Sequence, residues 1–280
     1  MGRPSRELGP SEAEGSQPSA ARHASASYNQ VVPPRIAIPM PHSIDREYAE
    51  RAIPQYERAV EQAGGEPVRI PLNQTSAEIM NTEVLKIMES CDGVVLPGSK
   101  ADVDPSKFGA QRSPHTAAAD LRRDAVDELL LHDAYNRRKP VLGICYGLQS
   151  LNVYRRGSLI QHIPDFLPQD LRPKVNHEAG KNVAVAHTVE IESDSKLEDI
   201  LGKGDKHMLP VNSSHHQSAE VIGNGLHIAA RCPEDGIIEA LEGTALDHFV
   251  LAVQWHPERS VDQDEASRAI FRALIKAAQH

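Results

Sequence analysis

The sequence predicts an α/β protein with a mostly parallel central sheet and helices on both faces. Short apolar runs bounded by proline or glycine alternate with amphipathic helical patterns in the first half of the chain, as is typical of strand–helix–strand units. In the second half, residues 181–192 and 226–254 instead alternate apolar and polar side chains. This change predicts mixed or antiparallel strands, so we expect a smaller antiparallel section in the C-terminal half.

Each element follows from its local pattern. Four apolar runs predict buried strands, at 35–39, 68–71, 91–98 and 140–145. Apolar residues at helical spacing predict helices over 47–63, 76–89, 120–134 and 264–278. Pro54 lies inside the first of these helices, where it should start a new turn or kink the helix.

The first 32 residues differ from the rest of the chain. Residues 1–30 consist mainly of Ser, Ala, Gly, Pro, Glu and Arg, and their only large aliphatic side chains are Met1 and Leu8. Such a segment buries too little apolar surface to offset the entropy of ordering it. We therefore expect a disordered N-terminal tail over 1–32 and one folded domain over 33–280.

Composition excludes several classes of function. The 280 residues carry 30 basic and 39 acidic side chains, a formal charge of −9, and only 4% are aromatic, which argues against a nucleic-acid partner. No apolar run reaches the roughly 18 residues of a membrane span, and the N-terminus lacks the apolar region of a secretory signal. The three cysteines form no CxxC pair. We expect a cytoplasmic protein without nucleic-acid or membrane partners.

The segment Gly143-Ile-Cys145-Tyr-Gly147 carries the first candidate chemistry. A predicted strand ends at a nucleophilic residue and a helix opens directly after it, with glycines on either side that permit a sharp turn. That is the arrangement of a nucleophile elbow, with sulfur in place of oxygen, and the positive end of the helix favours a thiolate. The alternative is an inert core cysteine between two packing glycines, because cysteine is commonly buried.

A second segment supplies a candidate base. Trp255-His256-Pro-Glu258 places a carboxylate two residues after a histidine, across a stiff proline. Glu258 can then orient the imidazole of His256, and His256 can act as base and later as acid for Cys145. The alternative is a surface histidine beside a turn.

Together these segments resemble the class I glutamine amidotransferase-like superfamily, and within it the γ-glutamyl hydrolases typified by γ-glutamyl-γ-aminobutyrate hydrolase. Three further segments agree with that family: the loop Leu96-Pro-Gly98-Ser-Lys-Ala-Asp102-Val-Asp104-Pro105, the pair Arg123-Asp124, and Val211-Asn212-Ser213-Ser214-His215-His216-Gln217. The resemblance covers about residues 35–275. It implies a flavodoxin-like three-layer sandwich.

The resemblance also implies a reaction. Cys145 would attack the γ-carbonyl of a small γ-glutamyl compound, giving a γ-glutamyl thioester that water activated by His256 would hydrolyse to glutamate. The oxyanion would be held by the backbone N–H of Tyr146 and by one from Gly98 or Ser99. The glutamyl moiety would be bound by residues after the nucleophile and in the later segment: Gln149, Asn212, Ser213, Ser214, His215 and His216. Tyr146 replaces a more usual arginine, and either lines the leaving-group pocket or packs against a helix.

Two other functions are consistent with the same segments. The chain could instead be a glutaminase subunit that delivers ammonia to a separate synthetase, or a catalytically silent γ-glutamyl-binding protein. We expect no cofactor and no metal, because His215 and His216 would point to opposite faces of an extended segment, with no carboxylate or cysteine at ligand spacing. A homo-oligomer is possible, and the sequence leaves the leaving amine open.

Overall fold

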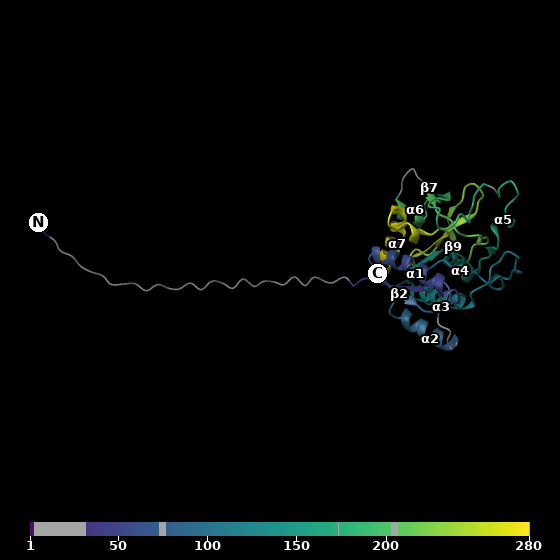
Figure 1. Ribbon diagram of the computed structural model, residues 1–280. Coiled ribbons are helices and arrows are strands. Elements are labelled where there is room, and N and C mark those ends of the chain that lie inside the picture. The colour runs from purple at the N-terminus through teal and green to yellow at the C-terminus, as the bar shows by residue number, and fades with distance from the viewer. Residues whose placement is uncertain (3–31, 73–76, 173, 203–206, 280) are drawn as a thin grey trace. The chain divides into compact units, whose positions relative to one another are not determined.

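The computed structural model describes residues 1–2, 32–72, 77–172, 174–202 and 207–279. Contacts divide the chain into two units, Met1–Val32 and Pro33–His280. The expected disordered tail falls almost wholly on residues 3–31, which lie outside the described residues, so it stays a prediction. The second unit contains all the elements shown in Figure 1.

One half of the central sheet is parallel, as expected. Its strands lie in the order β2 (Glu66–Ile70), β1 (Arg35–Pro39), β3 (Gly93–Leu96), β4 (Val141–Ile144) and β11 (Val250–Val253). Leu96 pairs with Gly143, and Val253 pairs with Ile144. The carboxyl ends of these three central strands therefore lie side by side, at the edge where open α/β sheets bind their ligands.

The other half of the same sheet is antiparallel. It continues from β11 through β10 (Ile238–Gly243), β9 (Leu226–Arg231), β6 (His187–Ile191) and β7 (Met208–Val211). A separate two-stranded sheet joins β5 (Leu159–Ile160) to β8 (Ser218–Ala219). The alternation predicted over 181–192 was wrong in its first half: β6 begins only at His187, and Val183 and Val185 are exposed and unpaired.

Helices cover the sheet on both faces (Figure 1). On one face α1 (Arg46–Gln62) packs against α7 (Glu265–Ala278), in a core that contains Ile53 and Phe271. On the other, α3 (Leu121–Arg137) packs between α2 (Ala77–Met88) and α4 (Tyr146–Tyr154), in a core that contains Leu130 and Leu148. This three-layer arrangement confirms the predicted fold class.

The shorter helices lie in the connections. They are the α-helices α5 (Ile163–Phe166) and α6 (Lys196–Leu201) and the 3₁₀ turns η1 (Pro105–Phe108) and η2 (Pro257–Arg259). Pro54 lies within an unbroken α1, so it does not divide this helix into two. No helix in the described part of the chain is long and apolar enough to cross a membrane.

Candidate active site

Cys145 occupies a strained turn between β4 and α4. Its backbone has φ 54° and ψ −104°, a conformation that a non-glycine residue adopts only when its surroundings impose it. The flanking glycines make the turn possible: a Cβ on Gly143 would lie 2.8 Å from the carbonyl oxygen of Gly147, and a Cβ on Gly147 would overlap the carbonyl group of Leu96. The predicted elbow is therefore present, with Cys145 directly before the first helical residue.

Three chain segments meet at Cys145. A Cβ built on Gly98, in the loop after β3, would lie 2.8 Å from Cε1 of His256, 3.1 Å from the hydroxyl of Tyr56 and 3.5 Å from Cβ of Cys145. The fold thus brings together the candidate nucleophile after β4, the candidate base after β11 and the glycine loop after β3. All three lie at the carboxyl edge of the parallel strands.

His256 and Glu258 form a buried ion pair. Nδ1 of His256 lies 2.8 Å from Oε1 of Glu258, and both side chains are almost completely buried. Burial alone would lower the pKa of His256, but the charges of Glu258 and Cys145 outweigh it and raise that pKa to about 9. Burial conversely raises the pKa of Glu258, and the facing imidazole outweighs it and lowers that pKa below its usual value. The proline between them keeps this geometry within a single 3₁₀ turn, η2.

Asn212 fixes the backbone of His256. Its side-chain nitrogen donates to the carbonyl oxygen of His256 at 2.9 Å, and its side-chain oxygen accepts from the N–H of His256 at 3.0 Å. Asn212 comes from the end of the antiparallel strand β7, and it is 7% exposed. With both ends of its amide engaged, Asn212 is positioned to hold the candidate base in place.

The loop after β3 is held from two sides. The N–H of Gly98 donates to the hydroxyl of Tyr56 at 3.0 Å. The fully buried Arg123 donates to the carbonyl oxygen of Pro97 at 2.7 Å and, from its other terminal nitrogen, to that of Pro41 at 3.2 Å. Of the two donors expected from this loop, the amide of Gly98 is therefore already engaged.

Tyr146 packs against α3. Its hydroxyl donates to the carboxylate of Asp124, and the guanidinium of Arg123 lies 4.8 Å from the centre of its ring. Burial raises the pKa of Asp124 to about 6, although the bond from Tyr146 opposes that rise. Of the two predicted positions for the Tyr146 side chain, the structure shows the packed one. The backbone N–H of Tyr146 opens α4, where main-chain donors lack an intrahelical partner.

The predicted substrate-binding residues lie in two places, on α4 (Gln149) and in the segment 212–216 after β7. Gln149 is buried and donates to the carbonyl oxygen of Gln217 at 3.1 Å. Three of the others also have protein partners: Ser213 donates to the carbonyl oxygen of His177 at 2.7 Å, Ser214 accepts from Arg259 at 2.8 Å, and Nε2 of His216 lies 3.0 Å from Oδ1 of Asp102.

His215 and His216 contact different carboxylates: Nε2 of His215 lies 3.5 Å from Oε1 of Glu239, and Nε2 of His216 lies 3.0 Å from Oδ1 of Asp102. Both histidines line one cavity. Sequence spacing showed no carboxylate near His215, and the fold supplies Glu239.

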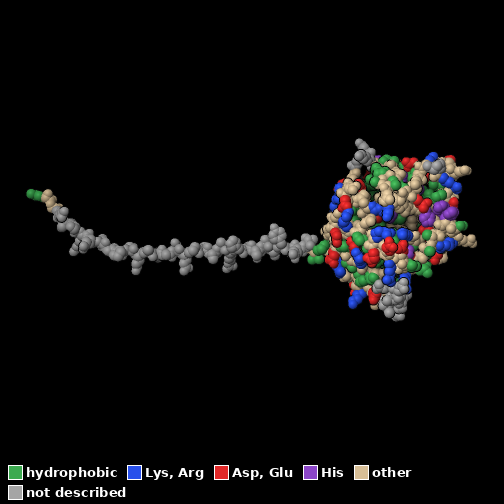
Figure 2. All heavy atoms as spheres, in the orientation of Figure 1, with side chains coloured by type: hydrophobic (Ala, Val, Ile, Leu, Met, Phe, Trp, Pro, Cys, Tyr) green, Lys and Arg blue, Asp and Glu red, His purple; other side chains and the backbone are tan. Residues whose placement is uncertain are grey.

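A cleft opens beside Glu258. It has a volume of about 890 Å³ and is lined mainly by α1 together with residues from three other segments: Tyr48, Arg51, Ala52, Pro54, Gln55, Tyr56, Arg58, Lys100, Lys181, Asn182, Glu258 and Arg259. Burial, and then the charges of Cys145 and Glu258, raise the pKa of Tyr48 to about 12. Tyr48 therefore remains a neutral hydroxyl next to the candidate catalytic groups. Figure 2 shows a hollow on the viewed face with basic side chains along its edge.

Sequence reasoning missed two residues near this site. Tyr56 lies on the buried face of α1, between Ile53 and Val60, and its hydroxyl in an otherwise apolar stripe was the available signal. Arg259 directly follows Glu258, with Nε 3.6 Å from Oε1 of that carboxylate. Its position beside the His-Pro-Glu segment was visible in the sequence.

Comparison with solved structures identifies the fold. The glutaminase domain of Trypanosoma brucei CTPS, solved with bound acivicin, superposes with a TM-score of 0.56 over 88% of this chain and 93% of that chain, at 17% sequence identity. At this identity the similarity concerns the fold. The chain thus has the fold of glutamine amidotransferase domains.

The sequence comparisons then give the family. The chain belongs to the Peptidase C26 family, whose model matches residues 36–258. It is 33% identical over 230 residues to the gamma-glutamyl-gamma-aminobutyrate hydrolase of Escherichia coli K12, covering 81% of this chain and 85% of that protein. It is also 37% identical over 223 residues to a Mycobacterium tuberculosis protein provisionally named a glutamine amidotransferase, covering 80% of this chain and 66% of that protein.

Proposed function

We propose that the chain hydrolyses the γ-glutamyl amide bond of a small γ-glutamyl compound, with Cys145 as nucleophile. The observation that carries this proposal is the convergence of Cys145, in its strained elbow, with the buried His256–Glu258 pair at one edge of the sheet. Membership of the Peptidase C26 family and the similarity to a hydrolase over most of both chains support it.

The reaction proceeds in two steps. The sulfur of Cys145 attacks the γ-carbonyl carbon, the C–N bond breaks, and His256 gives a proton to the departing amine, which leaves a γ-glutamyl thioester on Cys145. His256 then takes a proton from water, whose oxygen attacks the thioester carbon. The C–S bond breaks, glutamate leaves, and Cys145 is regenerated. Glu258 stabilises His256 as an imidazolium, the form that holds the proton of Cys145 before the amine leaves and the proton of water until the C–S bond breaks.

The oxyanion is stabilised by main-chain donors. We assign the N–H of Tyr146 as one donor, since it opens α4 directly after Cys145. The N–H of Gly98 or Ser99 is the second, and the bond from Gly98 to Tyr56 favours Ser99. The glutamyl moiety is bound from Gln149 and the segment 213–216, since both ends of the Asn212 amide hold the backbone of His256. Among the histidines that line the neighbouring cavity, His216 is the least buried.

The cleft beside Glu258 indicates the kind of leaving group. Five of its lining side chains are cationic, namely Arg51, Arg58, Lys100, Lys181 and Arg259, and Glu258 is the single carboxylate among them. Acidic residues outside the cleft pair with three of these cations: Glu47 with Arg51, Asp262 with Arg58 and Asp45 with Lys100. Arg259 pairs with Glu258 inside the cleft, and Lys181 has no ion pair among the described residues, so Lys181 is available to an incoming carboxylate. A leaving amine that bears a carboxylate, such as γ-aminobutyrate, therefore fits better than a polyamine.

A substrate panel tests the proposal. The purified full chain is incubated with γ-glutamyl-γ-aminobutyrate, a γ-glutamyl polyamine and glutamine, and glutamate release is measured for each. We expect the carboxylate-bearing substrate to be cleaved fastest, and Cys145→Ala to abolish release, because no nucleophile remains. Cys91→Ala is the matched control, since Cys91 is also a buried free thiol and should retain activity. Unchanged turnover by Cys145→Ala would exclude this mechanism.

The same panel separates the alternatives. Glutamine cleavage that appears only when a synthetase partner is added would indicate a glutaminase subunit. Tight binding of γ-glutamyl compounds without release of glutamate would indicate a silent binding protein.

A further inference from the structure

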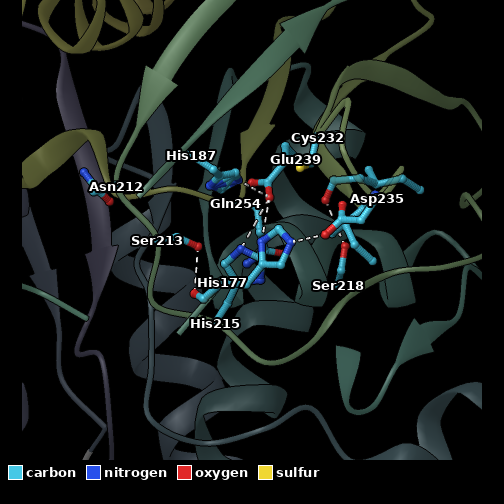
Figure 3. A network of polar contacts seen from close by, with 12 residues as sticks. His177, His187, Asn212, Ser213, His215, Ser218, Cys232, Asp235, Glu239 and Gln254 are labelled. Atoms are coloured by element: carbon cyan, nitrogen blue, oxygen red, sulfur yellow. Dashed lines mark hydrogen bonds and ion pairs between the residues drawn. The ribbon is translucent and has the colours of Figure 1, made fainter. Parts of the chain in front are cut away.

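A second polar cluster adjoins the segment 212–217, from which it includes His215, in the antiparallel half of the sheet (Figure 3). Its centre is Glu239 on β10, which is completely buried. Three imidazole nitrogens face the same oxygen, Oε1 of Glu239: Nε2 of His187 at 2.9 Å, Nδ1 of His177 at 3.2 Å and Nε2 of His215 at 3.5 Å. Bond breaking and proton transfer in the hydrolysis described above use none of these four side chains, and only His215 belongs to the segment assigned to the glutamyl moiety.

Hydrogen bonding fixes the tautomer of His215. Its Nδ1 lies 3.0 Å from the carbonyl oxygen of Gln217, and a carbonyl oxygen only accepts, so Nδ1 carries the proton. In the neutral ring Nε2 is then a bare lone pair, and it faces a carboxylate oxygen. Within the described residues this buried Nε2 has no hydrogen-bond partner. Two acceptors that face each other need a cation between them.

His177 repeats this arrangement. Its Nε2 lies 2.9 Å from Oδ2 of Asp235, which assigns a proton to Nε2. In the neutral ring the lone pair of Nδ1 then faces Glu239. Nδ1 is also a buried atom without a hydrogen-bond partner among the described residues. Histidines that bind metals commonly donate their other ring N–H to a carboxylate or a backbone carbonyl. His177 and His215 show one case of each.

We propose that His177 Nδ1, His215 Nε2 and the carboxylate of Glu239 bind a divalent metal ion, with Zn²⁺ as the best fit. Ligands about 2.0–2.1 Å from a tetrahedral zinc lie about 3.3 Å apart, close to the 3.2 and 3.5 Å between Glu239 and the two histidines. The ligand atoms of these three residues all lie within 4.8 Å of one another. His187 donates to Glu239 and orients the ligating carboxylate.

Charge and access also fit this proposal. The two positive charges of the ion balance the buried carboxylates of Glu239 and Asp235, so both histidines can remain neutral. A cavity of about 240 Å³ is lined by both ligand histidines, His177 and His215, and gives the ion a route in and a fourth position for water. Cys232 lies near His177 and His187, but its thiol donates to Glu234.

The metal would position the segment that holds the candidate base. The carbonyl oxygen of His177 accepts from the hydroxyl of Ser213 at 2.7 Å and from the N–H of His215 at 2.9 Å. An ion that joins His177 and His215 to β10 would therefore fix residues 213–215, directly after Asn212. This assigns the ion a positioning role that does not require contact with the substrate.

Metal analysis tests the proposal independently of hydrolysis. The full chain is produced without a histidine tag, and its zinc content is measured by mass spectrometry after dialysis. We expect about one zinc per chain, reduced to below about 0.1 in His215→Gln and in Glu239→Gln. Two control variants should keep their zinc: His248→Gln, a buried histidine outside the cluster, and His162→Gln, in a separate exposed group with His115 and Asp165.

Cobalt binding and circular dichroism distinguish the loss of the metal site from a failure of the variant to fold. Cobalt added to chelator-treated wild-type protein should give the visible absorption of a tetrahedral ion, and circular dichroism shows whether each variant keeps its secondary structure. Folded variants that retain zinc, or zinc lost only in His162→Gln, would overturn the assignment. A wild-type chain that binds neither zinc nor cobalt would also overturn it, and a proton on His215 would then bridge to Glu239.

Discussion

The N–H of Gly98 donates to the hydroxyl of Tyr56 at 3.0 Å. This bond links the loop after β3 to the buried face of α1, directly beside Cys145 and His256. It distinguishes the N–H of Gly98 from that of Ser99, which sequence reasoning treated as equivalent oxyanion donors. Gly98 has a partner within the protein, and Ser99 follows it in the chain.

Tyr56→Phe should therefore affect stability more than catalysis. The N–H of Gly98 would lose its partner in a buried site, which costs about 1–3 kcal/mol, so thermal denaturation should show a lower Tm. We expect kcat to fall less than about tenfold, compared with about 10²–10³ for the loss of an oxyanion donor. A hundredfold lower kcat at unchanged Tm would instead mean that the hydroxyl acts on the reacting carbonyl.

Gly147→Ala should prevent the elbow from forming. Its Cβ would overlap the backbone of Leu96, which cannot move without breaking the sheet, so we expect a loss of about 3 kcal/mol or more. Gly180→Ala is the control: Gly180 has φ +89° and open space around it, so only the cost of the left-handed backbone, about 1–2 kcal/mol, applies. Urea denaturation compares the two variants, and equal losses would contradict the steric explanation.

The pH profile of hydrolysis should have an alkaline limb near pH 9. The pKa of His256 is raised to about 9 in the folded chain, and above it the imidazole can no longer protonate the leaving amine. In Glu258→Gln the carboxylate is gone, so the limb should move to lower pH and kcat should fall. Measurements of kcat/KM between pH 6 and 10 follow both changes. A limb that stays in place would exclude His256 as the acid.

The same group links stability to pH. The pKa of His256 is higher in the folded chain than its ordinary value of 6.5, so its protonation favours folding. This stabilisation is complete below about pH 6.5 and is lost as the pH rises through about 9. The Tm of the wild type should therefore fall more steeply over that range than the Tm of Glu258→Gln. Parallel curves would argue against the ion pair.

Asn212→Ala should lower kcat with little change in KM. The substitution removes both hydrogen bonds to the backbone of His256, and a small misplacement of a catalytic group can cost about 10²-fold in rate. Steady-state kinetics on the substrate that is cleaved best would measure this. A raised KM with unchanged kcat would instead show that Asn212 binds the glutamyl moiety.

Local patterns were sufficient to predict the central strands and the elbow. Gly143 and Gly147 indicate a turn that only small residues allow, and the strands that end before Gly98, Cys145 and His256 end at one edge of any parallel sheet. The extent of β6 was harder to predict, because Val183 and Val185 alternate like strand residues but have no partner strand. Pairing is a property of the tertiary structure that a single segment does not carry.

The partners of side chains could not be predicted in the same way. Residues 177, 215 and 239 are far apart in the sequence, and their convergence depends on the order of β6, β9 and β10 in the sheet. Neither the bond from Tyr56 to Gly98 nor the bonds from Asn212 to His256 follow from the spacing of the residues. Sequence reasoning placed Asn212 in the site by resemblance, and its contact with the backbone of His256 required coordinates.

Asn212 also connects the antiparallel half of the sheet to the parallel half. It directly follows β7 at the antiparallel edge, whereas His256 follows a parallel strand nearer the centre. A change in the outer strands can therefore alter turnover while leaving the nucleophile, the base and the glycine loop untouched. Variation in this outer region offers a way to adjust the rate of the enzyme without rebuilding its centre.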